Sequence, residues 1–195
     1  MRTDMDDPVR QACIEMGIED EARALLAPGI AAHDAVRTLL AAQQVQAALQ
    51  LLAALLPKRY VVAWLCQCAR GEALGDDDRA GAALAEQWVR DPIEHNRRIA
   101  YEFASADGYR TLGGWLAAAA GWSGGSLAPA AQDTPVPPPP FLTARAATAA
   151  INLLAAIEPD RLDIRRIAFA HRALVLLADH AGAAPPRPEP TRIPS

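Results

Sequence analysis

The stretch from Trp122 to Phe141, which reads WSGGSLAPAAQDTPVPPPPF, decides how the rest of the chain is organised. It contains two glycines and six prolines, and Asp133 is its one charged residue. The four consecutive prolines 137–140 cannot continue a helix, because each lacks a backbone N–H and fixes φ at about −65°. Such a run favours extended polyproline II. We predict an ordered strap lying across the helices, because apolar side chains recur along the stretch and can anchor it. These side chains are Trp122, Leu127, Val136 and Phe141.

The composition indicates a helical domain. Hydrophobic residues make up 51% of the 195-residue chain, and Ala and Leu dominate them. That bias favours helices over strands, which prefer β-branched and aromatic residues. The length predicts one domain or at most two small ones. The net charge of −4 argues against nucleic acid as a partner, since a nucleic-acid-binding surface needs a basic stripe.

Hydrophobic residues recur with helical spacing on both sides of the strap. Asp6-Asp7-Pro8 is a helix-start signal, and glycine or proline separates most of the segments that follow. The expected helices cover residues 8–16, 19–26, 33–56 (one helix, or two broken near 41–44), 57–69, 78–90, 93–106, 111–121, 143–157 and 159–180. We expect the 57–69 helix to be the central core helix, and the Ala-rich run 117–120 to let another helix approach closely.

These segments predict an all-α fold, a compact array of about eight to nine helices with the strap at 122–141. Residues 1–183 form one helical domain in this interpretation. The proline-rich residues 184–195 form a flexible, disordered tail, because they cannot bury enough apolar surface to order themselves. Residues 47–59 and 149–161 are identical at eight of thirteen positions. This echo indicates a repeated helix–Pro–helix unit, or a chance match inflated by the Ala and Leu bias.

Two of the expected helices carry charged faces. In 93–106, the pattern places Ile99 and Phe103 inward and four charged side chains outward. Those four are Glu94, Arg97, Arg98 and Glu102. Three arginines share one face of the last helix, which we expect to be solvated; the alternative is that it meets an acidic partner protein. They are Arg161, Arg165 and Arg172. We also expect Thr143 to cap the helix that follows the strap.

The N-terminus and the cysteines bear on location. The opening MRTDMDDPVR lacks the apolar core of a secretory signal. No window reaches about 18 apolar residues free of charge, so no transmembrane helix and no membrane partner are expected. Cys13, Cys66 and Cys68 are an odd count whose spacing suits neither a disulfide nor a zinc site. We therefore predict a cytoplasmic protein with free, buried thiols.

No residue pattern predicts a catalytic, metal or cofactor site. The triplet Asp76-Asp77-Asp78 suggests a metal, but acids at a helix start also complement the helix dipole, and we favour capping. The histidines, at positions 33, 95, 171 and 180, lack the spacing of a zinc set, and we expect structural or solvated roles. We therefore expect no enzymatic activity, no metal and no cofactor.

The turn Ser123-Gly124-Gly125-Ser126 is the best candidate for a ligand site. Consecutive Gly and Ser residues can expose backbone N–H groups as an anion-binding nest. A phosphate loop would also need a lysine and a helix directly after it, whereas Leu127-Ala128-Pro129 follow here. A structural turn is therefore the first interpretation, and binding of an anion with help from Arg97 or Arg98 is the alternative.

Three segments together resemble a known family: LLPKRYVVAWLCQCARG (55–71), QWVRDPIEHNRRIAYEFASADG (87–108) and WLAAAAGWSGGSLAP…VPPPPFLTARA (115–146). The family is an uncharacterised bacterial domain of unknown function with a WSGGSLAP…PPPP signature, and the resemblance covers roughly residues 35–157. The chain departs from the family pattern at 60–63, where the pattern is more acidic and has a double tryptophan. It departs again at Gly121, where the pattern has an aromatic residue.

The resemblance implies an all-helical cytoplasmic protein of proteobacteria, often encoded beside type VI secretion components. It implies an accessory that helps to assemble or load secreted spike and effector proteins, and it carries over no catalytic residue. We therefore predict a non-enzymatic adaptor or chaperone-like protein whose partner is another protein, such as a secretion spike or effector. The alternative is a helical domain that binds a small molecule or anion through the SGGS turn. The candidate surface comprises Trp122, Ser123, Gly124, Gly125, Ser126, Leu127, Pro138, Phe141, Arg97 and Arg98, with Trp64, Trp88 and Trp115 as further groove walls.

Overall fold

Helices make up the regular structure of the described residues, which confirms the predicted all-α class. The structure, a computed structural model, describes residues 7–129, 132 and 134–182. One short 3₁₀ turn, η1, accompanies the α-helices. In chain order the elements are α1 (Pro8–Met16), α2 (Asp20–Ala24), α3 (Ala32–Ala41), α4 (Val45–Leu55), α5 (Lys58–Ala69), α6 (Asp76–Arg90), α7 (Glu94–Asp107), α8 (Leu112–Gly121), α9 (Leu142–Ala156), η1 (Pro159–Arg161) and α10 (Leu162–Gly182).

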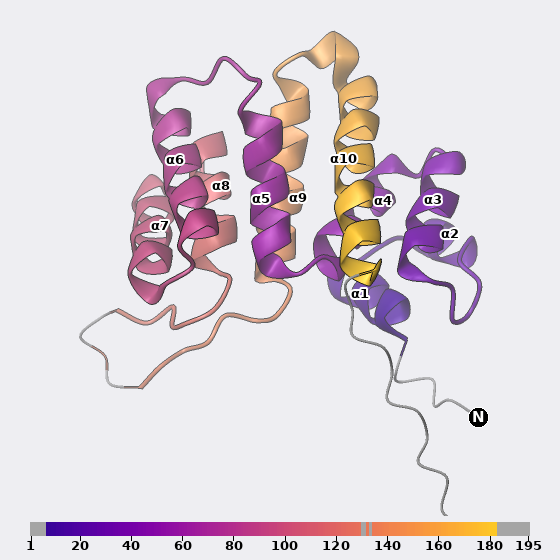
Figure 1. Cartoon of the computed structure of the whole chain (residues 1–195), viewed down its shortest axis with the longest axis horizontal. Coiled ribbons are helices and arrows are strands. Elements are labelled where there is room, and N and C mark those ends of the chain that lie inside the picture. Colours follow the sequence, from indigo (N-terminus) through magenta and orange to yellow (C-terminus); the bar gives the residue numbers. More distant parts are fainter. Residues whose placement is uncertain (1–6, 130–131, 133, 183–195) are drawn as a thin grey trace, which may run out of the picture.

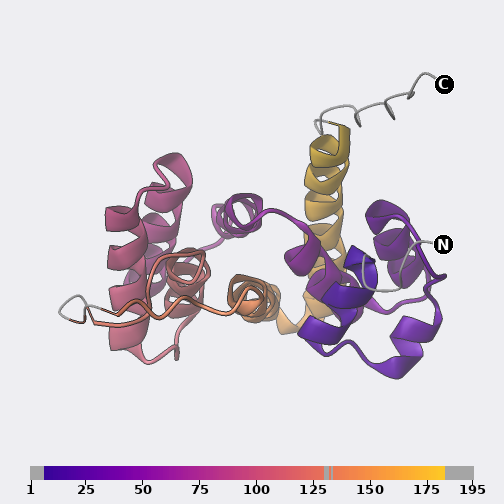
Figure 2. The ribbon, with the colours of Figure 1, turned by 90° about the horizontal axis from the view of Figure 1, so that it is seen from below.

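The helices form a broad array (Figure 1). Helices α6, α7 and α8 stand together at one side, α5 and α9 occupy the middle, and α10, α4 and α1 to α3 fill the other side. Helix α8 packs against α6, α7 and α9, while α9 also contacts α5, α4 and α10. These two helices therefore connect the two sides. Seen from below, the described parts of the strap run across the lower ends of α8 and α9 (Figure 2).

Local signals begin and end the first helices as the sequence predicts. The Asp7 carboxylate accepts hydrogen bonds from two backbone N–H groups in the first turn of α1. Gly17 closes α1 in the left-handed region, at φ 64°. The segment 33–56 forms two helices rather than one, because the chain turns between α3 and α4 with Gln43 at φ 60°. This turn lies at the break predicted near 41–44.

Helix α8 is buried by its neighbours over most of its surface. Its alanines 117–120 are fully buried. Its glycines let adjacent backbones touch: a Cβ on Gly81 of α6 would overlap the carbonyl oxygen of Gly113. A Cβ on Gly121 would lie 2.6 Å from the Cα of Tyr101 in α7. The close approach predicted for this Ala-rich segment is confirmed, and α6 and α7 are the helices that approach.

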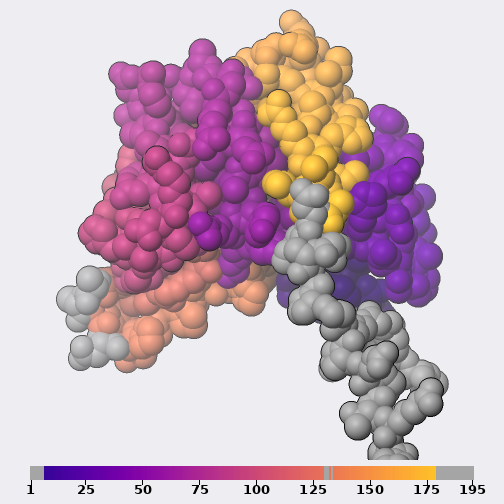
Figure 3. Space-filling model, viewed as in Figure 1, coloured from indigo at the N-terminus to yellow at the C-terminus, as the bar shows by residue number. Residues whose placement is uncertain are grey.

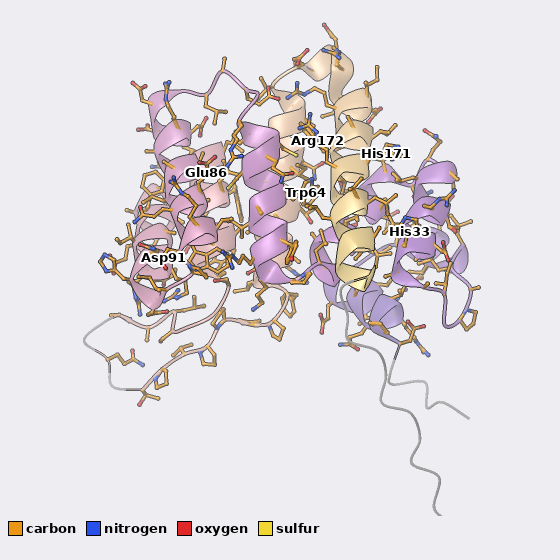
Figure 4. All side chains as sticks on the ribbon, in the orientation of Figure 1. His33, Trp64, Glu86, Asp91, His171 and Arg172 are labelled. Carbon is orange, nitrogen blue, oxygen red and sulfur yellow. The ribbon has the colours of Figure 1, made fainter. Side chains whose placement is uncertain are left out.

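Trp64 on α5 lies in the centre of the core. Its side chain is fully buried, and its indole Nε1 donates to the carbonyl oxygen of Phe169 on α10 at 3.0 Å. Figure 4 shows Trp64 between these two helices. A buried indole N–H normally needs such an acceptor. The predicted central position of α5 is therefore confirmed, and the bond joins residues 105 positions apart.

The two segments that echo each other in sequence adopt related structures. Each is an apolar helix, a proline break and a second helix: α4 and α5 around Pro57, and α9 and α10 around Pro159. Pro57 leads directly into α5, whereas Pro159 opens η1 before α10 begins. A common origin of the two units stays a prediction.

Thr143 does not cap α9, contrary to the prediction. The helix begins at Leu142 with Phe141 at the N-cap position, because the Leu142 N–H already donates to the carbonyl of Pro139 at 3.1 Å. Thr143 is buried inside the first turn, and its hydroxyl has no hydrogen-bond partner within the described residues. The end of the proline run, rather than a side-chain cap, therefore sets the start of α9.

The predicted charged faces of α7 and α10 are partly wrong. Arg97, expected outside, is only 3% exposed, whereas Ile99 and Phe103 are half-buried rather than fully inward. Arg165, expected on a solvated face, has a side chain that is 11% exposed. Arg97 is buried against Glu94 of its own helix and against carbonyls at the end of α8 and in the strap. Arg165 is buried against Glu72, Glu158 and the carbonyl of Leu154, all outside α10. Helical periodicity within one segment does not reveal such contacts.

Part of the predicted organisation falls outside the structure. The predicted tail, residues 184–195, and the first six residues lie outside the described residues, as does residue 183. Across 7–129, 132 and 134–182, no helix combines the length and the apolar character needed to cross a bilayer. The strap is described except at residues 130, 131 and 133.

Candidate functional site

Arg97 on α7 is the centre of the contacts that hold the strap. Its Nε and one Nη donate to the two carboxylate oxygens of Glu94, at 2.7 and 2.6 Å. Its remaining hydrogen bonds reach the end of α8 and the strap: Nη1 donates to the carbonyl of Gly121, the last residue of α8, and Nη2 also donates to that of Ser126 at 3.2 Å. A guanidinium presents its donors in a rigid planar fork. Arg97 therefore fixes the first turn of the strap relative to α7.

Two further side chains of α7 continue this row of contacts. Arg98 Nη1 donates to the carbonyl of Ala128 at 2.9 Å, and the Tyr101 hydroxyl donates to the carbonyl of Leu127 at 2.8 Å. The Arg98 guanidinium also lies over the Tyr101 ring, 5.5 Å from its centroid. Side chains of α7 thus bind this part of the strap through the backbone carbonyls of the strap. The attachment therefore depends on the backbone path of the strap more than on its side chains.

Lys58, at the start of α5, also holds this turn. Its Nζ donates to the carbonyl of Ser123 at 2.9 Å. Burial lowers the pKa of the Lys58 ammonium, because removal from water disfavours the charged form. Lys58 and Arg97 therefore hold the two ends of the SGGS turn from two different helices.

Ser126 closes the strap into a lobe. Its hydroxyl oxygen accepts hydrogen bonds from the backbone N–H groups of Ala128 at 3.1 Å and of Val136 at 2.9 Å. The Leu127 N–H donates to the carbonyl of Val136 at 2.8 Å, so the two arms of the strap pair side by side. Ala128 is buried at the base of the lobe, whereas Pro129 and the described residues 132, 134 and 135 are exposed. Hydrogen bonds thus close the base of the lobe, and its tip is exposed to water.

The predicted apolar anchors of the strap divide into two groups. Trp122 is half-buried and packs with Tyr109 and Trp115, with ring centroids 5.1 and 6.2 Å away. Phe141 is half-buried against the core, as predicted. Val136 is 46% exposed, so the prediction of an anchor is wrong there. The reason is that Val136 attaches to the strap through its backbone groups, which leaves its side chain facing water.

The proline run follows the lobe along the surface. Pro137 and Pro139 are exposed, and Pro138 is half-buried, as is Leu127 on the opposite arm. Together with Val136, these prolines form an apolar and uncharged edge. We call residues 136–140 the strap edge.

The two glycines of the SGGS turn differ in their surroundings. Gly125 is in the left-handed region at φ 63°, and a Cβ there would lie 2.5 Å from both Arg97 Nε and Glu94 Oε2. A Cβ on Gly124 would meet nothing within 4 Å. The Glu94 carboxylate therefore borders the turn, and the hydrogen bond from Arg97 holds its pKa below the usual range. An anion at the turn would meet this charge, so the geometry favours the structural interpretation over anion binding.

The predicted groove walls mostly belong to the core. Trp64 and Trp88 are buried, and Trp115 is half-buried in the cluster with Trp122. A small cavity of about 140 Å³ does open at the end of the strap, beside Phe141 and the ends of α1 and α4. Trp64 and Trp88 therefore do not line a surface groove beside the strap, whereas the strap edge is largely exposed.

The two cysteines of α5 are not activated as nucleophiles. Cys66 and Cys68 are free and buried, as predicted, and burial raises the pKa of each thiol to about 12. Neither therefore forms a thiolate near neutral pH. No group of three or more His, Cys, Asp or Glu among the described residues could hold a metal ion. Asp78, from the acidic triplet in the first turn of α6, accepts the N–H of Gly113 at 2.7 Å.

Sequence reasoning missed two residues that hold the strap, Lys58 and Tyr101. Tyr101 could have been found, because it follows Arg97 and Arg98 by about one helical turn and so lies on their face of α7. Lys58 gives no local signal, since 65 positions separate it from its acceptor on Ser123.

Comparison with known proteins gives one match. No curated protein and no solved structure matches the chain. A family model described as a family of unknown function (DUF6931) matches residues 35–177. The matched residues include α4 to α9, the strap and most of α10, and so extend past the end of the resemblance seen in the sequence. The chain therefore belongs to DUF6931, a family of unknown function.

Proposed function

We propose that this protein is a non-enzymatic adaptor that binds a partner protein through the strap edge, residues 136–140. The observation that carries the proposal is the way the strap is held. Side chains of α5 and α7 donate to carbonyl groups along residues 121–128, yet the strap edge is left largely exposed to water.

A simple connection between α8 and α9 would not need this arrangement. Connections between packed helices usually take about two to eight residues, whereas this one runs from Trp122 to Phe141. Long loops without secondary structure of their own are commonly binding or lid segments. Holding such a loop in one shape by four hydrogen bonds from neighbouring helices supports a role in recognition.

The chemistry of the strap edge indicates the kind of partner surface that fits it. Proline fixes φ, so the edge loses little conformational entropy on binding. Exposed polyproline segments dock into grooves lined by aromatic side chains. We infer a partner protein that offers such a groove. The family resemblance makes secretion spike and effector proteins the first partners to test, and such a role belongs in the cytoplasm.

The experiment is recovery of partners with the tagged full-length chain from its own host, followed by mass spectrometry. Val136→Asp adds a charge to the strap edge, where the backbone already supplies the contacts. Leu153→Asp on α9 is the matched control, because Leu153 has a similar exposure of 41%. We expect one stoichiometric partner with the unaltered chain and with Leu153→Asp, and its loss with Val136→Asp.

Two results would contradict the proposal. One is the absence of any stoichiometric partner for the unaltered chain. The other is a partner that Val136→Asp retains in full while that variant keeps the melting temperature of the unaltered chain, which would show that the strap edge is not the binding surface.

The alternative, anion binding at the SGGS turn, stays a prediction. The left-handed Gly125 is the feature that favours it, because nests for anions use such conformations. A thermal-shift screen with phosphates and nucleotides at millimolar concentration tests it directly. Stabilisation that is lost on changing Gly125 but not Gly124 would favour this alternative over the adaptor.

A further inference from the structure

A cleft runs between α3 and α10, on the side of the molecule away from the strap. Its volume is about 560 Å³. Figure 3 shows the yellow surface of α10 beside the violet surface of α3 on this face. Leu40, Ile167 and Leu174 supply most of its apolar lining. The cleft was not anticipated from the sequence, because its two walls lie more than a hundred positions apart in the chain.

The charge of this cleft is opposite to that of the chain. Arg37, His33 and His171 line it, and its lining contains no carboxylate, although the chain carries a net charge of −4. Figure 4 shows the two histidines between α10 and α3. The neighbouring acid is Asp34, whose Oδ1 lies 3.6 Å from His33 Nδ1. Within the described residues, Arg37 forms no ion pair. The cleft therefore offers the positive charge of Arg37 and the imidazole hydrogen-bonding groups of two histidines, which suit an acidic ligand group.

An apolar ridge on α10 borders the cleft. Ile164 and Val175 are 63% and 62% exposed, and Ala168 between them is also exposed. Successive residues of an α-helix are about 100° apart, so Ile164, His171 and Val175 fall within about 40° of one another. The ridge from residue 164 to 175 is about 16 Å long. Single exposed hydrophobic residues are common, but this series continues an apolar cleft.

Arg172 adds positive charge along the far side of the ridge. It is exposed, and its guanidinium lies 5.7 Å from the centroid of the Phe169 ring. Asp163, near the start of α10, is the acid closest to the ridge along the helix, and its carboxylate lies 3.8 Å from Arg166. The ridge thus has basic side chains on both flanks, Arg172 on one side and the cleft residues on the other.

We propose that the cleft and the ridge together form a docking groove for an amphipathic, acidic α-helix of a partner protein. Helices bind in such grooves by burying one apolar face, with anchors spaced one turn apart. About three turns of helix match the length of the ridge. Leucine-like side chains fit the lining at Leu40, Ile167 and Leu174, and flanking carboxylates meet Arg37 and the histidines. This groove is a second docking surface, separate from the strap edge.

The test uses two synthetic helical peptides of about 14 residues, labelled with a fluorophore. Both carry leucines on one face; one carries glutamates beside them and the other carries lysines. Fluorescence anisotropy with the full chain should show binding of the glutamate peptide and at least about tenfold weaker binding of the lysine peptide. Arg37→Glu should reverse that preference, because it exchanges the sign of the cleft charge.

Val175→Glu tests the ridge, and Leu153→Glu on α9 is the matched control. We expect Val175→Glu to weaken binding of the glutamate peptide at least about tenfold and Leu153→Glu to leave its affinity unchanged. Circular dichroism of each variant confirms that both remain folded. These variants leave the strap edge intact, so the result does not depend on whether the strap edge binds a partner.

Three results would overturn the proposal. The first is no binding of either peptide at about 1 mM, and the second is equal affinity for both peptides, which would show that charge plays no part. The third comes from sedimentation velocity. A dimer of the unaltered chain that Val175→Glu converts to monomer would show that a second copy covers this face.

Discussion

Arg97 and Arg165 are both buried and both hold a non-helical connection, but their carboxylate partners meet water differently. Arg165 pairs with Glu72 at 2.6 Å and also with Glu158, and the Glu72 side chain is only 13% exposed. Arg97 pairs with Glu94, whose side chain is 59% exposed. Loss of Arg165 would leave a buried carboxylate without its counter-charge, whereas loss of Arg97 would leave one that water can solvate.

This difference in the exposure of the carboxylate makes the Arg165 contact costly to break and the Arg97 contact easier to break. Arg165 also donates to the carbonyl of Leu154 at 2.8 Å, so it joins the end of α9 to the loop after α5. Breaking a buried pair strands a charge at high cost. Arg97 can leave its strap carbonyls at a lower cost, because Glu94 remains hydrated. The strap is thus held in place without being locked into the core.

The largest effect is expected for Arg165→Met. We expect the free energy of unfolding to fall by about 4 kcal/mol, because Glu72 stays buried without a partner. Chemical denaturation followed by circular dichroism measures this value. The double variant Arg165→Met/Glu72→Met should recover most of the loss, since an apolar pair of similar volume replaces the ion pair. An equal loss in the double variant would show that charge burial is not the cause.

Arg97→Met comes next. We expect a loss of about 2 kcal/mol, because the carbonyls of Gly121 and Ser126 lose charge-assisted hydrogen bonds while Glu94 becomes hydrated. Hydrogen exchange should rise across 122–129, and the fluorescence of Trp122 should shift. Arg98→Met, which removes one carbonyl contact from a half-buried side chain, should cost about 1 kcal/mol. A loss for Arg97→Met as large as that for Arg165→Met would contradict the comparison.

Gly125→Ala tests the contact between Arg97 and the strap by a change in the strap itself. We expect it to cost about 1 to 2 kcal/mol, because a Cβ is strained at φ 63° and crowds Arg97 and Glu94. Gly124→Ala should change stability by less than about 0.5 kcal/mol, because open space surrounds that position. Thermal denaturation of the two variants side by side gives the answer. Equal effects would mean that the turn is free to rearrange.

The smallest effect on stability is expected from protonation of Glu94 and Glu158 as the pH is lowered. Hydrogen bonds from Arg97 and from Arg161 lower the pKa of Glu94 and of Glu158 in the folded state. A lowered pKa contributes stability that is present above the unfolded-state pKa of glutamate, about 4.3, and is lost as pH falls through the folded-state value. Both Glu94→Gln and Glu158→Gln should therefore flatten the decline of the melting temperature on acidification.

The two glutamates differ in which probe reports their protonation. In the unaltered chain, the fluorescence of Trp122 should change with the protonation of Glu94, because Arg97 links that carboxylate to the strap. Glu158→Gln should leave this fluorescence change in place, and Glu94→Gln should remove it. A change that persists without Glu94 would mean that the strap responds to another acid.

The fold could be predicted from local patterns, whereas the contacts that hold the strap could be predicted only in part: Arg97 and Arg98 were placed with the SGGS turn, but the burial of Arg97 was not expected. Helical spacing, the Asp7 cap and the Gly17 stop act within one segment, so the sequence shows them directly. Arg97 looks like an outward residue on its own helix, because its partners Gly121 and Ser126 lie on segments that fold back over α7. The residue pattern of one helix does not show which other segments will cover it.

The candidate site shows the same division. The strap was predicted from its prolines and glycines, whose backbone limits are intrinsic to each residue. The exposure of Val136 was not predicted, because it depends on which arm of the strap pairs with Ser126. The cleft between α3 and α10 was missed for a related reason, since its basic residues gather only after the chain ends have packed together.

During synthesis, the hydrogen bond between Trp64 and Phe169 can form only late. The indole must remain without its acceptor until 105 further residues have been translated. At typical ribosomal rates this takes on the order of ten seconds. Throughout that time the apolar face of α5 lacks the helix that finally covers it. The nascent chain must therefore pass through a state that is vulnerable to aggregation, and shortening of the message before α10 would turn this passing state into the final product.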